Sequence, residues 1–257
     1  MKKIQLEYTH EGMVARIILN DGKGNVLDGI MMKDLHEAFA KIKENKDIKL
    51  ITFEGAGKNF SFGASVEEHT KYNCEGMLKS FHQIFYEIID MYIPTMAKIS
   101  GQCLGGGMEL ALACNFLFAD KTAMMGQPEI MLGVYAPPAS LLLPLKIGSA
   151  RAEELLLTGN SIDADKALEI GLLNDVFEDR ETMEAMLDDW IKKNICKKSA
   201  SSLKYAVMVS RVEFNEVILN KLPALEDIYN RELMETDDAN EGINSFIEKR
   251  KPIWKNS

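Results

Sequence analysis

The first part of the chain alternates between short apolar runs and longer segments whose apolar residues recur every three or four positions. Short runs rich in branched side chains are typical of buried strands, and the longer spacing is typical of a helix with one buried face. This alternation predicts a layered α/β domain that binds its ligand where strand ends meet helix starts. The predicted strands are residues 4–8, 14–19, 50–53 and 95–99, and the predicted helices are about 31–43 and 77–89.

After about residue 180 the helical spacing continues with few strand signals. We therefore expect a core over residues 1–195 and a C-terminal helical region over residues 196–257. This region either covers the core or packs against another subunit, and the pattern is compatible with both roles. The expected helices are 182–192, 201–211, 221–235 and 238–249, after a short helix at 163–170 that Gly171 ends.

Composition narrows the class of protein. With 257 residues, of which 46% are hydrophobic and 27% charged, the chain can bury one large core, with or without an appendage. The net charge of −9 argues against nucleic acid or an anionic membrane surface as a general partner. The N-terminus enters a strand-like segment rather than a signal peptide, and no apolar run approaches the ~20 residues of a membrane span. The four cysteines and four histidines show no metal-ligand spacing, so we expect a reduced, cytoplasmic protein without a metal.

The most informative segment, residues 101–110, reads GQCLGGGMEL and leads into a helical run. Consecutive glycines let the backbone approach a ligand closely and adopt angles that are closed to other residues. At a helix N-terminus the unpaired N–H groups and the positive end of the dipole favour a developing negative charge. The segment therefore predicts a site for an oxyanion.

Two carboxylates accompany this site. Glu109 lies in the first helical turn after the glycines, and Glu129 follows Gly126-Gln127-Pro128. Each glutamate alone has an ordinary structural explanation, because acidic residues complement a helix dipole and Pro-Glu commonly opens a helix. An oxyanion site with two carboxylates nearby, however, suits acid/base chemistry beside a carbonyl.

With these residues the chain resembles the crotonase superfamily, also called the enoyl-CoA hydratase/isomerase family. The resemblance implies an α/β spiral of ββα units with a C-terminal helical region that mediates homotrimers, often paired as homohexamers. It also implies a hydro-lyase that acts on a coenzyme A thioester without a separate cofactor. The motifs that carry the resemblance are NVL at 25–27, NFSFGA at 59–64, GQCLGGGME at 101–109, GQPE at 126–129, TG at 158–159 and the tail at 241–250.

The resemblance also assigns roles to individual residues. Ala64 and Gly106 match the two oxyanion-hole positions, whose backbone N–H groups would bind the thioester carbonyl. Glu109 and Glu129 match the two catalytic glutamates of the hydratases, and the presence of both favours hydration over isomerisation or thioester cleavage. The substrate-binding residues implied in this way are Asn25, Val26, Phe62, Gly63, Ser65, Gly105, Tyr135 and Pro137.

Two segments depart from the common hydratase pattern. The oxyanion loop reads FGAS at 62–65 instead of AGAD, and VYAPPAS at 134–140 replaces a glycine-rich loop. Because prolines fix backbone angles, we expect a stiffer and differently shaped acyl pocket. The variations are most similar to those of family members that hydrate a cyclic dienoyl thioester. A cyclic dienoyl-CoA is therefore the expected substrate, with a linear enoyl-CoA as the alternative.

Several alternatives stay open at this stage. Glu67, Glu68 and His69 are expected to face solvent, as charged runs usually do, although they could line the acyl pocket. Tyr135 could contact the substrate or fill the core. The basic residues 249–251 could meet coenzyme A phosphates or form an exposed helix end. The presence of both glutamates disfavours a noncatalytic acyl-CoA-binding protein, and the sequence does not decide which glutamate activates water.

Overall fold

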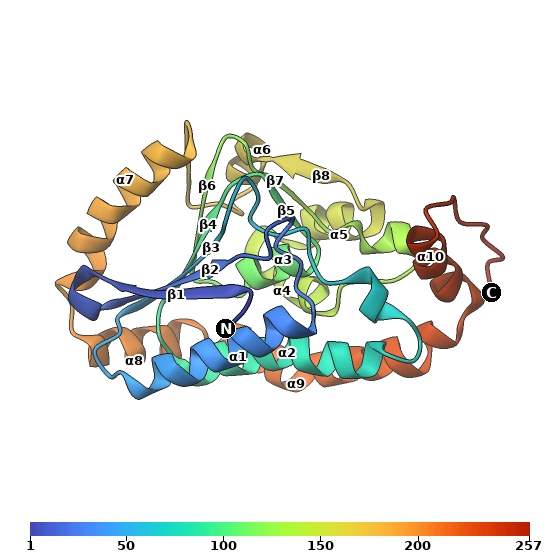
Figure 1. The fold of residues 1–257 in the computed structure, drawn as a ribbon, viewed down its shortest axis with the longest axis horizontal. Helices are drawn as coiled ribbons and strands as arrows, with labels where there is room; N and C mark the ends of the chain where they lie inside the picture. The colour runs from blue at the N-terminus through green and yellow to red at the C-terminus, as the bar shows by residue number, and fades with distance from the viewer.

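A six-stranded sheet forms the centre of the computed structural model, which describes all 257 residues (Figure 1). Its strands pair in parallel except at one edge, where the first two strands are antiparallel. Every residue of the third strand is buried, as expected of a parallel sheet that is covered on both faces. In spatial order the strands are β1 (Ile4–Thr9), β2 (Val14–Leu19), β3 (Leu50–Gly55), β4 (Thr95–Ile99), β6 (Phe116–Asp120) and β9 (Asp175–Phe177).

A second, three-stranded sheet holds β5 (Gln102–Leu104), β7 (Met124–Gly126) and β8 (Ser161–Asp163). The chain leaves β4 at Ile99, turns through Gly101 and enters β5, and after β6 it returns to this sheet as β7. From β4 to β7 successive strands therefore alternate between the two sheets, as in the spiral expected for the family. Both motifs with the candidate glutamates follow strands of the smaller sheet.

Helices flank the sheets, and three of them, α1, α2 and α9, lie side by side along one face (Figure 1). The first helix begins at a cap, because the Asp28 carboxylate accepts a hydrogen bond from Met31 N at 2.9 Å. The helices are α1 (Gly29–Glu44), α2 (Cys74–Met91), α3 (Gly106–Leu112), α4 (Pro137–Ile147), α5 (Ser149–Thr158), α6 (Ala164–Glu169), α7 (Arg180–Ile191), α8 (Ala200–Ser210), α9 (Val212–Arg231) and α10 (Asp237–Ile247).

Short 3₁₀ turns connect several of these elements. They are η1 (His10–Gly12), η2 (Val66–His69), η3 (Pro128–Leu132) and η5 (Leu233–Glu235), and a π-helical turn, η4 (Lys192–Cys196), extends α7. The turns η2 and η3 both contact α10, the last helix of the chain. The C-terminal region thus covers the core of its own chain, because α9 also packs on α2 and α4.

The structure corrects two expectations about helices. The helix expected at 221–235 begins earlier, at Val212, and continues through Pro223 to Arg231. The segment with Pro137 and Pro138, expected as a stiff loop, is the first turn of α4. A proline in the first turn removes an N–H that has no intrahelical acceptor, and its fixed φ suits the helix.

Candidate active site

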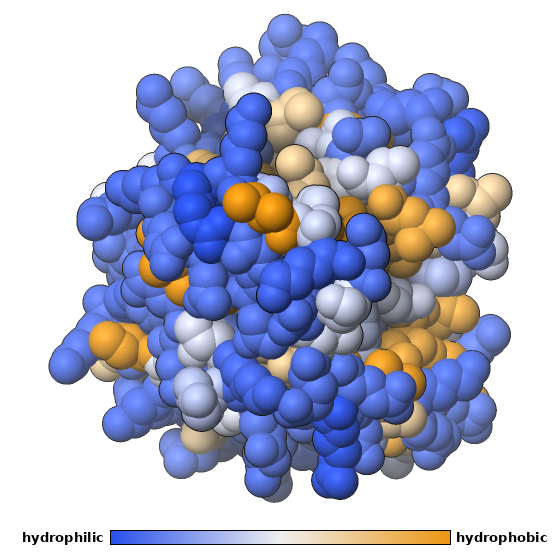
Figure 2. All heavy atoms as spheres, turned by 90° about the vertical axis from the view of Figure 1, so that its right-hand side faces the viewer, coloured by the Kyte–Doolittle hydropathy of each residue, from blue (hydrophilic) through white to orange (hydrophobic).

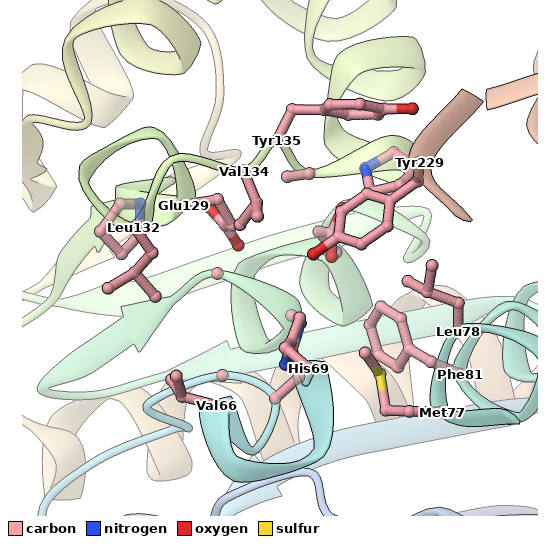
Figure 3. A pocket seen from close by; sticks show the side chains of 18 of the residues that line it. Val66, His69, Met77, Leu78, Phe81, Glu129, Leu132, Val134, Tyr135 and Tyr229 are labelled. Carbon is pink, nitrogen blue, oxygen red and sulfur yellow. The ribbon is translucent and has the colours of Figure 1, made fainter. Parts of the chain in front are cut away.

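A cavity lies where the start of α3 meets η2, η3, α2 and α9 (Figure 3). Its enclosed space is about 70 Å³, and the space including its open mouth is about 650 Å³. Both candidate glutamates and both candidate oxyanion residues line it, and most of the remaining wall is apolar. The sequence motifs at 62–64, 105–109 and 128–137 therefore converge on one place.

The two oxyanion positions face each other across the entrance to α3. A methyl group added at Gly106 would lie 3.1 Å from the backbone nitrogen of Ala64. Gly106 begins α3, so its N–H has no acceptor within the helix, and Ala64 N–H makes no backbone hydrogen bond in the turns and loops. Two neighbouring N–H groups without acceptors suit the oxygen of a thioester that gains enolate character.

Glycines allow this close approach. Gly63 has φ +101°, and a Cβ atom there would lie 2.8 Å from the carbonyl oxygen of Leu104. Gly105 has φ +50° and ψ −130°, angles that a side chain would strain. A larger residue at Gly63 would push the oxyanion loop away from the end of β5 and move the N–H donors apart, and one at Gly105 would displace the Glu129 carboxylate.

The Asn25 side chain holds the oxyanion loop in place by hydrogen bonds to its backbone. Its side-chain nitrogen donates to the carbonyl oxygens of Ala56, Asn59 and Phe60 at 3.1, 2.9 and 3.2 Å. Ser61 Oγ donates to the Asn25 carbonyl at 2.7 Å and accepts from Gly63 N at 3.0 Å. Asn25 is buried and fixes the loop that carries Ala64, but it does not line the cavity.

Glu109 is buried in the first turn of α3, with 3% of its surface exposed. Its Oε1 accepts a hydrogen bond from Ala139 N in the first turns of α4 at 2.9 Å. Burial, together with the negative charge of Glu129, raises the pKa of Glu109 well above its ordinary value. The proline-rich start of α4 therefore supplies the backbone donor that orients this carboxylate.

Glu129 reaches the same cavity from η3. Its carboxylate lies over Gly105, since a Cβ atom at that glycine would be 2.7 Å from Glu129 Oε1. Burial raises the pKa of Glu129 to about 7. With its amide nitrogen turned toward the carboxylate, Gln127 donates to the two oxygens at 3.1 and 3.0 Å. The opposite orientation is unfavourable, because it would place the Gln127 oxygen against two carboxylate oxygens.

The two glutamates act as one titrating pair. Each is buried at the cavity, and ionisation of Glu129 opposes ionisation of Glu109. Above about pH 7, where Glu129 has lost its proton and Glu109 keeps its own, the pair therefore holds one proton and one negative charge. It can accept a proton at one carboxylate and donate one from the other, which is the requirement for adding water to a double bond.

The structure brings together most of the substrate-binding residues expected from the sequence. Phe62, Gly63, Gly105, Tyr135 and Pro137 line the cavity. Asn25, Val26 and Ser65 lie outside its lining. The Tyr135 hydroxyl does not face the cavity as a free donor, because it donates to the Leu225 carbonyl in α9 at 2.5 Å.

Sequence reasoning missed two polar residues of the site and placed a third, His69, there only as the less favoured alternative. His69, expected to face solvent, lines the cavity, with Nδ1 2.7 Å from the Ser65 carbonyl oxygen, and burial lowers its pKa. Gln127 lies within the GQPE motif, but the sequence analysis assigns it no role in the site. Tyr229 comes from a helix far along the chain. No local motif marks Tyr229, whose place depends on how α9 packs.

The comparisons with known proteins identify the family and the fold. The sequence profile of the enoyl-CoA hydratase/isomerase family matches residues 9–257. An enoyl-CoA hydratase structure from Mycobacterium avium superposes with a TM-score of 0.86 at 24% identity, covering 98% of each chain, and shows the same fold. The chain belongs to the enoyl-CoA hydratase/isomerase family and is a hydro-lyase of the enoyl-CoA hydratase type.

Two curated relatives bear on specificity. Cyclohexa-1,5-dienecarbonyl-CoA hydratase from Thauera aromatica is 41% identical over 254 residues, covering 99% of this chain and 96% of the relative. The short-chain-enoyl-CoA hydratase from Clostridium acetobutylicum is 31% identical over 250 residues, covering 94% of each. The greater similarity is to the relative with the cyclic substrate.

Proposed function

We propose that the protein adds water to cyclohexa-1,5-diene-1-carbonyl-CoA to give 6-hydroxycyclohex-1-ene-1-carbonyl-CoA in anaerobic benzoyl-CoA degradation. The observation that carries this proposal is the 41% identity to the Thauera aromatica enzyme along nearly the whole chain. The start of α4 supports it, because Pro137 lines the cavity and the neighbouring Ala139 N–H orients Glu109. A rigid wall at this point suits a ring better than a flexible chain.

The oxyanion hole supplies the first part of the mechanism. The N–H groups of Ala64 and Gly106 would bind the thioester oxygen and stabilise the negative charge that it gains. Loss of one such donor in other enzymes costs roughly 3–4 kcal/mol of transition-state stabilisation. Withdrawal of electrons toward this oxygen makes the ring carbon β to the thioester electrophilic.

The glutamate pair supplies the proton transfers. The carboxylate takes a proton from water as the water oxygen bonds to C2 of the ring, and the electron pair of the C1–C2 double bond moves into the dienolate. The carboxylic acid then protonates C5, which leaves a double bond between C1 and C6. Renumbered, this is the 6-hydroxy-1-ene product, and the pair has regained the proton that it gave. Metal, redox cofactor and further co-substrate have no role in this proposal.

We also propose that the protein works as a homotrimer or a pair of trimers. Large apolar side chains are exposed on the C-terminal helices, which the family uses for assembly. A cytoplasmic location is proposed because all four cysteines are free, as is usual in a reducing compartment. No helix in the structure has the length and apolar character needed to cross a bilayer.

Substrate preference tests the proposed function. We expect kcat/KM for cyclohexa-1,5-diene-1-carbonyl-CoA to exceed that for crotonyl-CoA by about 100-fold, because a pocket shaped for a ring holds a linear chain in fewer productive poses. The measurement is the initial hydration rate with each thioester, with products separated by chromatography. Preference for crotonyl-CoA would replace the proposal with a general enoyl-CoA hydratase.

Two isosteric variants test the catalytic roles of the two glutamates. Glu109→Gln and Glu129→Gln should each lower kcat by about 100- to 10,000-fold, because each removes one partner of the proton transfers. Binding of the coenzyme A ester should change little, since neither amide alters the shape of the cavity. Near-normal turnover in both variants would refute the assigned roles.

A further inference from the structure

The Tyr229 hydroxyl lies at the cavity but has no part in the proton transfers of the glutamate pair. Tyr229 on α9 lines the cavity with both glutamates, and 1% of its surface is exposed. Its hydroxyl has no hydrogen-bond partner in the protein. In Figure 3 it points into the cavity, away from the helix that carries it. A buried phenol without a partner is costly, so it marks a place where a ligand atom completes the hydrogen bond.

The surroundings hold this phenol in place. The Tyr135 ring contacts the Tyr229 ring edge to face, with centroids 5.3 Å apart, and its own hydroxyl is bound to the Leu225 carbonyl. One turn before Tyr229, Glu226 Oε2 lies 2.6 Å from His82 Nδ1 on α2. Both hydrogen-bonded contacts anchor α9 one turn before Tyr229, and the ring of Tyr135 packs on the Tyr229 ring itself, so the free hydroxyl is preorganised.

The environment of the cavity determines the protonation state of the Tyr229 hydroxyl. Burial and the nearby carboxylates of Glu129 and Glu109 raise the pKa of Tyr229, so the phenol stays neutral. A neutral phenol donates one hydrogen bond and accepts others. Because the glutamate pair already takes and gives the transferred protons, the phenol is available to orient the attacking water by donating to its oxygen.

We propose that Tyr229 is a catalytic residue whose hydroxyl donates a hydrogen bond to the oxygen of the reacting water and, after addition, to the new hydroxyl of the product. The water gives one hydrogen to the ionised glutamate, accepts from Tyr229 with one lone pair and attacks the ring carbon with the other. Tyr229 keeps its proton throughout, so the balance of the hydration step is unchanged. This inference rests on the proposed function and deepens it.

The test compares two ligands that differ by the product hydroxyl. In Tyr229→Phe, the inhibition constant of 6-hydroxycyclohex-1-ene-1-carbonyl-CoA should rise about tenfold, as expected for one lost hydrogen bond. The constant for cyclohex-1-ene-1-carbonyl-CoA, which lacks the hydroxyl, should stay within about twofold. In the same variant kcat should fall about 10- to 100-fold with little change in KM, because the water loses its orientation.

Tyr8→Phe on β1 is the matched control, since this exposed phenol is remote from the cavity and should change none of these constants. Equal weakening of both ligands in Tyr229→Phe would show a purely structural role and overturn the inference, as would unchanged binding and turnover. If the wild type hydrates only linear thioesters, the proposed substrate fails. The same comparison then uses 3-hydroxybutyryl-CoA and butyryl-CoA, so the role of Tyr229 is decided separately.

Discussion

At the scale of single residues, Glu109 and Glu129 share a cavity but differ in their donors. Glu109 accepts a backbone N–H from Ala139, whereas Glu129 faces the Gln127 amide. Neither donor balances the cost of burial, so both pKa values are raised. Their shared proton makes the protonation state of the pair, rather than of either residue, the quantity that controls turnover.

This shared proton predicts the pH dependence of turnover. As the pH falls below about 7, Glu129 gains a proton and the pair loses its base. We expect kcat/KM to decline toward about tenfold per pH unit on this side, and to fall again at high pH when the second proton leaves. The measurement is kcat/KM from pH 5 to 9, and a flat acid limb would contradict the raised pKa.

The same titration changes stability, which gives a check independent of turnover. The unfolded Glu129 ionises near its ordinary pKa of 4.5, whereas the folded residue stays protonated up to about 7. Because the folded state then binds more protons, wild-type stability falls as the pH rises between these values. Glu129→Gln should therefore become more stable than wild type by about 1–3 kcal/mol at pH 8, with little difference near pH 4.5. Thermal unfolding at both pH values measures this difference.

Some site residues could be predicted from sequence, and others could not. Ala64, Gly106, Glu109 and Glu129 lie in short motifs, and the resemblance to the family assigns their roles. Tyr229 reaches the cavity through the packing of α9 on distant elements, which leaves no local signal. His69 directly follows the oxyanion loop, so the sequence offers it as a cavity residue, although solvent exposure is the favoured expectation. The protonation of the glutamate pair also depends on burial, and burial is a property of the folded chain.

At the scale of elements, α10 fixes the turn that carries Glu129. Gly242 of α10 lies so close to η3 that a Cβ atom there would be 2.0 Å from the Leu132 carbonyl oxygen. Ile243, the next residue, lines the cavity. The backbone of α10 is thus a direct support for η3, and only a glycine permits the contact.

We expect Gly242→Ala to destabilise the protein by about 1–3 kcal/mol, because the new methyl group forces α10 and η3 apart. Movement of η3 displaces Glu129, so kcat should fall as well. Gly76→Ala on α2 is the matched control, since a methyl group there meets no atom within 4 Å and should stabilise the helix by about 0.5–1 kcal/mol. Denaturant unfolding compares the two variants, and wild-type stability in Gly242→Ala would contradict the close contact.

The elements themselves were predictable to different degrees. The early strands are short runs of branched apolar residues, and helices α1 and α2 show clear periodicity because each buries one face in the core. The sequence does not reveal the start of α4, because its two prolines are equally common in loops. The sequence also predicts the helix of α9 to begin at residue 221, whereas it begins at Val212. Local composition cannot distinguish a proline that opens a helix from one that ends it without knowing which carbonyls are free.

At the scale of the molecule, apolar side chains remain exposed on the C-terminal elements. Figure 2 shows the face that bears α10 and the chain end, where hydrophobic groups lie separately between hydrophilic ones. On α8 and α9 the exposed apolar residues recur along the helices and include Tyr205, Val209, Val212, Leu219 and Ile228. Such surfaces are typical of protein–protein contacts.

These surfaces predict an assembly of identical chains. Light scattering coupled to size exclusion should give three or six times the monomer mass of 28.8 kDa. Leu219→Asp should shift the distribution toward smaller species, because a carboxylate cannot be buried unpaired at an interface. A monomer of the wild type at all accessible concentrations would contradict the assembly.

The cavity draws its walls from widely separated stretches of the chain, from Phe62 on the oxyanion loop to Ile243 on the last helix. During synthesis, the glutamates leave the ribosome long before Tyr229 and α10 do. A nascent or C-terminally clipped chain would therefore carry both acid/base residues in a half-built, open pocket. The cavity is complete only when α9 and α10 have been synthesised and have packed on the core. Damaged or unfinished copies would therefore not process thioesters.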